Sequence, residues 1–125
     1  MINIMLINER RDFQFTKTDM EYLNNNEVGT IFTEIPCHTL IPQDCVFVFI
    51  EIAKTIGLNT IYDILKYSLM HLLGHIQKKI PKEESSTTYI FRFGDKEYSL
   101  TFPTGLTEAQ QDKLLDAAIE KFIQL

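Results

Sequence analysis

The segment "NTIYDILKYSLMHLLGHIQKKI", residues 59–80, carries the clearest structural signal in the chain. Projected at 100° per residue, its large apolar side chains share one wide side and its charged and amide side chains lie opposite. This pattern predicts one long helix over residues 59–80, capped by Thr60 with Asp63 three residues later. The predicted buried side comprises Ile61, Leu65, Leu69, Leu72, Leu73 and Ile76, and the polar side comprises Asp63, Lys66, Gln77 and Lys78.

The residues that follow this helix predict a hairpin and a final helix. In "TYIFRFGDKEYSLTF", residues 88–102, apolar and polar side chains alternate about a central Gly-Asp pair, which is typical of a β-hairpin. Thr107 with Gln110 three residues later predicts a capped helix to the C-terminus. We expect one side of the hairpin to pack on this helix. The predicted apolar stripe of the last helix comprises Leu114, Leu115, Ala118, Ile119 and Phe122.

The N-terminal third predicts two strands separated by a short helix. The apolar runs at residues 2–7 and 30–36 are of strand length, and Pro36 ends the second. Between them, "TKTDMEYL" predicts a helix from about Asp19, with Thr18 as its N-cap and Glu21 three residues on.

The segment "CVFVFIEI", residues 45–52, leaves two interpretations open. Its β-branched and aromatic residues favour a buried strand. Asp44 as an N-cap and the continuation to Gly57 favour a helix instead. Strands and helices do not alternate regularly, so we expect an α+β fold. The expected architecture is a small single globular domain over residues 1–125, with a mostly antiparallel sheet packed against a long central helix and a C-terminal helix.

Composition excludes several classes of function. The 125 residues are 45% hydrophobic and 23% charged, as in ordinary globular proteins, and the net charge of −5 disfavours direct nucleic-acid binding. The N-terminus lacks the basic region of a signal peptide, and no apolar run is long enough to span a membrane. Two cysteines in such a chain are most simply reduced thiols, so we expect a cytoplasmic protein.

The stretch "HLLGH" places His71 and His75 four residues apart, the spacing at which two helical histidines hold a metal ion. Metal hydrolases with this spacing carry a glutamate beside the first histidine, and here Leu72 stands in its place. The helical projection puts both rings at the border between the apolar and polar sides, where an imidazole needs no ligand. We therefore expect neither a metal nor another cofactor. A zinc-stabilised domain remains an alternative, whose further ligands would come from Cys37, His38 and Cys45.

Charge is unevenly distributed along the chain. Residues 19–63 hold seven acids and one base, a net charge of −6, whereas residues 64–82 hold four bases and no acids, a net charge of +4. An acidic patch steers a basic protein partner during association. The leading hypothesis is therefore a non-enzymatic protein that binds a protein partner through a partly acidic face containing Glu27, Glu34 and Asp44.

Within this class, an immunity-like or antitoxin-like inhibitor of a basic toxin or nuclease is the specific hypothesis. Nucleases carry basic surfaces that meet phosphate, and a small acidic inhibitor is complementary to such a surface. The alternative is a small-molecule-binding domain, or an enzyme without a familiar motif, that uses His38, His71 and His75 as acid–base groups.

Overall fold

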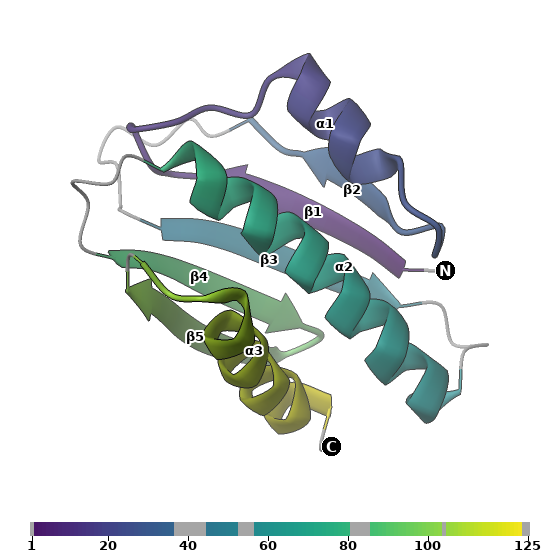
Figure 1. Cartoon of the computed structure of the whole chain (residues 1–125). Coiled ribbons are helices and arrows are strands. Elements are labelled where there is room, and N and C mark those ends of the chain that lie inside the picture. Colours follow the sequence, from purple (N-terminus) through teal and green to yellow (C-terminus); the bar gives the residue numbers. More distant parts are fainter. Residues whose placement is uncertain (1, 37–44, 53–56, 81–85, 104, 124–125) are drawn as a thin grey trace.

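The computed structural model describes residues 2–36, 45–52, 57–80, 86–103 and 105–123, with residues 58–59 and 122–123 described by their backbone alone. In this part of the chain, one sheet is covered on one face by α-helices (Figure 1). The α+β class is confirmed. In chain order the elements are β1 (Ile2–Asn8), α1 (Lys17–Asn24), β2 (Ile31–Glu34), β3 (Cys45–Ile52), α2 (Leu58–Lys79), β4 (Ser86–Phe93), β5 (Lys96–Pro103) and α3 (Glu108–Ile123).

The sheet is mixed, so the prediction of a mostly antiparallel sheet is wrong. Its strand order is β2-β1-β3-β4-β5. β1 pairs with β2 and β3 pairs with β4 in parallel, whereas β1–β3 and β4–β5 are antiparallel. Each parallel pair is joined by a helix, α1 or α2, because parallel neighbours need a crossover that returns the chain to the same end of the sheet. The chain thus contains two β-α-β units, which the sequence pattern did not reveal.

The ambiguous residues 45–52 form a strand at the centre of the sheet. β3 pairs with β1 along one edge and with β4 along the other. A central strand satisfies its backbone groups on both edges, which favours the β-branched and aromatic residues of "CVFVFI". The helical interpretation also relied on the residues that continue this segment to Gly57. Of these, residues 53–56 lie outside the described residues.

The predicted hairpin is confirmed. Phe93 pairs with Lys96, so Gly94 and Asp95 form a two-residue turn. Gly94 has φ of +63°, and positive φ at the first turn position is the arrangement that glycine adopts without steric cost.

The long helix is present as α2, but its N-terminus differs from the prediction. The helix begins at Leu58, and its N-cap is Gly57, which makes no side-chain capping bond. The Ile61 N–H donates to the Gly57 carbonyl at 2.9 Å, so Thr60 lies inside the first turn. The residues of the apolar side that are fully buried are Leu65, Leu69, Leu72, Leu73 and Ile76, while Ile61 is only partly buried.

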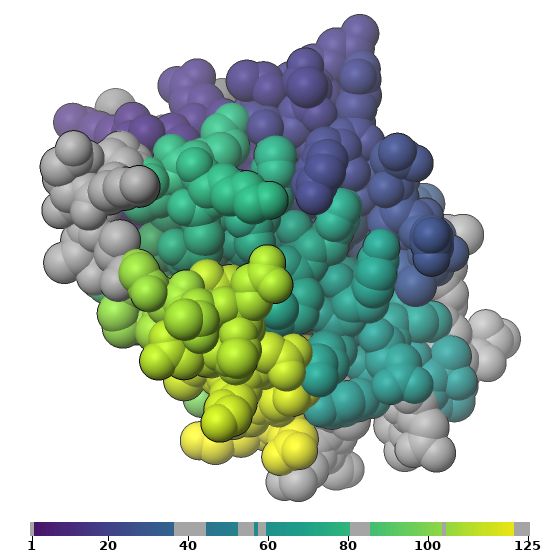
Figure 2. Space-filling model, viewed as in Figure 1, coloured from purple at the N-terminus to yellow at the C-terminus, as the bar shows by residue number. Residues whose placement is uncertain are grey.

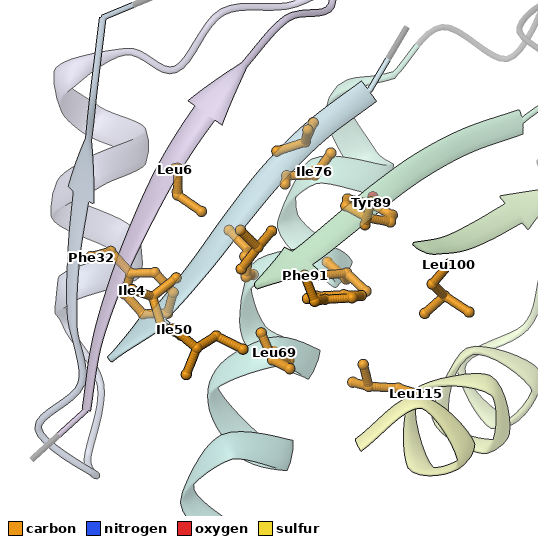
Figure 3. Packing of buried hydrophobic residues seen from close by; sticks show 14 of the residues in the cluster. Ile4, Leu6, Phe32, Ile50, Leu69, Ile76, Tyr89, Phe91, Leu100 and Leu115 are labelled. Atoms are coloured by element: carbon orange, nitrogen blue, oxygen red, sulfur yellow. The ribbon is translucent and has the colours of Figure 1, made fainter. Parts of the chain in front are cut away.

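The buried apolar side chains form one core between the sheet and the helices. Figure 3 shows Ile50 of β3 next to Leu69 of α2, and Phe91 of β4 on the side of Leu115 of α3; with Ile4 of β1 these residues belong to one core cluster. All five are 5% exposed or less. This layer is what fixes the position of α2 on the sheet, because every side chain removed from water here favours the packed arrangement.

α3 is capped as predicted. The Gln110 N–H donates to the Thr107 hydroxyl at 3.2 Å, and the Thr107 N–H donates to the Gln110 side-chain oxygen at 2.9 Å. Leu115, Ala118 and Ile119 are buried, as predicted, whereas Leu114 is 36% exposed. The Phe122 side chain lies outside the described residues.

α1 begins two residues earlier than predicted. Thr16, rather than Thr18, is the N-cap, and Asp19 completes the capping box with it. The end of α1 is tied to the edge strand, since the Asn24 side-chain oxygen accepts from the Phe32 N–H at 2.7 Å and its amide donates to the Phe32 carbonyl at 3.0 Å. The Asn24 side chain therefore makes the two hydrogen bonds to Phe32 that a further strand would otherwise make at the outer edge of β2.

Candidate functional site

The two histidines of "HLLGH" lie against α1. The Tyr22 ring stacks on both imidazoles, with centroid distances of 4.7 Å to His71 and 4.5 Å to His75. Tyr67, one turn before His71, continues this row of nearly parallel rings at 6.1 Å. Both histidines are partly exposed, so the prediction that they lie at the border of the helix is confirmed.

Asp19 joins α1 to the C-terminal half of α2. Its carboxylate accepts from His75 Nε2 at 2.7 Å and also pairs with the Lys79 ammonium. Burial opposes ionisation of this carboxyl, but hydrogen bonds from Lys79, Thr16 and His75 outweigh the burial and hold the pKa of Asp19 well below its ordinary value. His75 is therefore engaged in a structural contact between two helices.

The other flank of α2 meets α3 through a more exposed contact. The Tyr62 hydroxyl donates to Asp116 at 2.7 Å, and the Lys66 ammonium pairs with Asp112 and Asp116 at 3.3 and 3.1 Å. The bond from Tyr62 and the pairing with Lys66 lower the pKa of Asp116 against a smaller opposing effect of burial. Lys66, which was predicted on the polar side of α2, thus joins α2 to α3.

The predicted zinc ligands are not brought together in the described part of the chain. Among the described residues, no group of three His, Cys, Asp or Glu side chains is arranged to hold a metal ion. Cys37 and His38 lie outside the described residues. Cys45 is buried, with its sulfur 4.0 Å from a Glu9 carboxylate oxygen.

A groove of about 650 Å³ lies beside the row of rings. Its lining consists of Tyr22 of α1, residues of α2 between Tyr67 and Lys78 with Ile80 just after that helix, and residues 105–111, which lead into α3 and form its first turn. Figure 2 shows this helical face of the molecule, with the surface of α2 visible between α1 and α3. His71 and His75 both line this groove and are partly exposed.

The predicted acidic residues lie along one edge of the sheet. Glu27 is exposed in the connection between α1 and β2, and Glu34 is exposed at the end of β2. Burial and the nearby Asp19 charge raise the pKa of Glu34. Asp44 lies outside the described residues.

The face of the sheet opposite the helices is apolar at its centre. Side chains alternate along a strand, so Met5 and Ile7 point away from the buried side of β1. The register places Ile7 beside Phe47 and Met5 beside Phe49. On the other side of β3, Ile90 of β4 lies beside Phe47. These five partly exposed side chains (Met5, Ile7, Phe47, Phe49 and Ile90) form what we call the open face.

Polar groups border the open face. The Arg92 guanidinium lies 5.8 Å from the Phe49 ring centroid and donates to Glu97 at 2.8 Å. Sequence analysis missed this surface, although β1 and β3 carry apolar residues at both odd and even positions, a sign that both faces of a strand are apolar.

Comparisons with known proteins identify no family for this chain. No protein-family model matches it, and neither curated proteins nor solved structures give a match. The described residues also contain no helix that is both long and apolar enough to cross a membrane. The surfaces of the described residues that bear on function are the open face, the edge of the sheet that carries Glu27 and Glu34 (the acidic edge), and the groove.

Proposed function

We propose that this chain is a non-enzymatic protein-binding domain whose protein partner packs on the open face. One observation carries the proposal: Met5, Ile7, Phe47, Phe49 and Ile90 form a contiguous apolar cluster on the side of the sheet away from α1, α2 and α3. None of the helices in the described part of the chain covers this side (Figure 1).

The composition of the open face is that of a binding surface. Covering apolar surface stabilises a complex by about 25 cal/mol for each Å² removed from water. Phenylalanine, methionine and arginine are enriched at the centres of protein interfaces, and polar residues surround them. Phe47 and Phe49 stack with centroids 6.2 Å apart, and Arg92 borders them. The expected partner is a protein that presents an apolar patch.

The acidic edge supports a more specific form of the proposal, an immunity-like inhibitor of a basic toxin or nuclease acting in the cytoplasm. The chain has a net charge of −5, and Glu27 and Glu34 are exposed at the β2 edge of the same sheet. With Asp44, these residues would steer a basic partner and raise its association rate. The open face would then supply the contacts that hold the complex.

The test is affinity capture from the native cell, with identification of what is retained and reconstitution from purified components. Phe47→Ser with Ile90→Ser should weaken binding of the retained partner at least tenfold. Leu114→Ser is the matched control, because Leu114 is also an exposed apolar residue but lies on α3. A partner that binds the double variant as well as it binds the wild type contradicts the proposal, as does a wild-type chain that retains nothing.

A further inference from the structure

Gly74 is a costly residue inside the C-terminal part of α2 that nothing in the described structure requires. Glycine inside a helix costs about 1 kcal/mol relative to alanine. A close helix crossing or a backbone with positive φ would explain it, but a Cβ at this position meets no atom within 4 Å and the backbone is helical. Gly74 lines the groove. Because glycine has no side chain, Gly74 leaves this part of the groove open.

Aromatic residues in the lining of the groove near Gly74 form an exposed row. Tyr22 and Tyr67 are exposed aromatic residues, with 46% and 42% of their surface accessible to solvent. The planes of neighbouring rings in the row Tyr67–His71–Tyr22–His75 differ by 15 to 25°. Aromatic groups attract one another in offset-stacked arrangements, so a further planar ring fits against this row.

The rest of the lining determines the ligand's polarity. Met70 and Leu106 are apolar, and Gln111 is a polar group at the start of α3. Lys78 and Glu108 have opposite charges, which favours a ligand without net charge over a phosphate-bearing one. The volume of about 650 Å³ lies in the range of roughly 300–1,000 Å³ that is typical of small-molecule sites.

We propose that the groove between α1, α2 and α3 binds a small, uncharged planar aromatic molecule with hydrogen-bonding groups along one edge. The ring stacks on the aromatic row, the space above Gly74 admits it, and the polar edge meets the side chains at the start of α3. This site lies on the helical face of the sheet, so it is independent of the protein partner proposed for the open face.

Titration with indole, followed by NMR of the full chain, tests this site, and cyclohexanol serves as a saturated probe of similar size. Indole should shift the ring resonances of Tyr22, His71 and His75 saturably, with a dissociation constant of about 1 mM or below. Cyclohexanol should bind at least tenfold more weakly, because it has no aromatic face. Absence of saturation up to about 10 mM indole, or equal binding of both probes, overturns the proposal.

Substitution of Gly74 separates the site from the fold. Gly74→Leu should weaken indole binding at least tenfold without lowering the melting temperature, since leucine is a better helix former and its Cβ meets no neighbour. Gly57→Ser is the matched control, because Gly57 also has open space around its Cβ position but does not line the groove. Unchanged binding by Gly74→Leu overturns the proposal.

Two further measurements cover poor folding of Gly74→Leu and occupation of the groove by a second copy of the chain. Tyr67→Ala removes an exposed ring that is outside the core, and it should weaken indole binding even if Gly74→Leu folds poorly. Sedimentation of the wild type and Gly74→Leu over a range of concentrations detects a second copy in the groove. Self-association that the substitution abolishes assigns the groove to that copy and overturns the small-molecule proposal.

Discussion

The two faces of the sheet are built from the same strands, yet one is a core and the other a surface. On β1, Ile4 and Leu6 are completely buried beneath the helices, while the neighbouring Met5 and Ile7 are partly exposed. The two sets have similar side chains. The difference shows that apolar character alone does not decide burial, which depends on whether another element covers that side of the strand.

The helices cover only one face because of how they connect the strands. α1 joins β1 to β2, α2 joins β3 to β4, and α3 follows the hairpin, and all lie on the same side (Figure 1). A sheet that is apolar on both sides but covered on one retains apolar surface for another molecule.

The largest effect is expected from matched phenylalanine truncations on the two faces. Phe91→Ala should lower the free energy of unfolding by about 3–5 kcal/mol, because Phe91 is 1% exposed in the core. Phe47→Ala should cost less than about 1.5 kcal/mol, because Phe47 lies on the open face and loses fewer contacts. Urea unfolding followed by circular dichroism measures both. Equal losses would mean that the open face is covered in the folded chain.

A smaller effect is expected from the contact that holds α1 on the helical face. Asp19→Asn should destabilise the protein by about 1–3 kcal/mol at pH 7, because the bonds from His75 and Lys79 lose their charged acceptor. Asp116→Asn, the matched change on the α3 flank, should cost less than about 1 kcal/mol, because its side chain is 30% exposed.

The pH dependence of stability identifies the cause of the Asp19 effect. The folded pKa of Asp19 lies below its ordinary value of 3.8, so the unfolded chain takes up the proton first as pH falls. Its contribution is fully present above about pH 5 and is lost as pH falls below 4 toward the folded pKa. Thermal unfolding from pH 7 to pH 2 should show the wild type and Asp19→Asn converging at the acid end. A constant difference would assign the effect to packing.

The smallest effect on stability is expected at the acidic edge. Glu27→Lys with Glu34→Lys should change the free energy of unfolding by less than about 0.5 kcal/mol, because both residues are exposed. The same change should slow association with a basic partner, and added salt should slow the wild type in the same way. Stopped-flow association at several salt concentrations measures this. Rates that respond to neither change would leave the open face as the sole binding determinant.

Local patterns predicted the elements whose stabilising contacts are close in sequence. The hairpin depends on a two-residue turn at Gly94 and Asp95, and the cap of α3 depends on Thr107 and Gln110 three residues apart. The α1 cap was predicted two residues late because "TKTDME" contains two overlapping capping boxes, one at Thr16 and one at Thr18. Contacts from α2 to Asp19 favour the first box, and these contacts are distant in sequence.

The candidate sites likewise combine features that local sequence patterns predicted with contacts between distant segments that they did not predict. Periodicity alone placed His71 and His75 at the border of α2, but Tyr22, which stacks on both, comes from another helix. Gly74 lies inside the helix that periodicity predicts, and the tertiary structure places it on a groove. The open face escaped prediction because three strands from distant segments contribute to it.

The sequence by itself determined the long helix, the hairpin, the final helix and most of the buried residues of the long helix, because periodicity, turn residues and caps act over a few neighbouring residues. Only the tertiary structure decided that β3 is a central strand, that two strand pairs are parallel and that all the described helices share one face. These outcomes depend on which distant surfaces exclude water together and on where each crossover returns the chain. The open face and the groove follow from that arrangement. The open face is the side of the sheet that the described helices do not cover, and the groove is the hollow beside α2 that α1 and α3 leave unfilled.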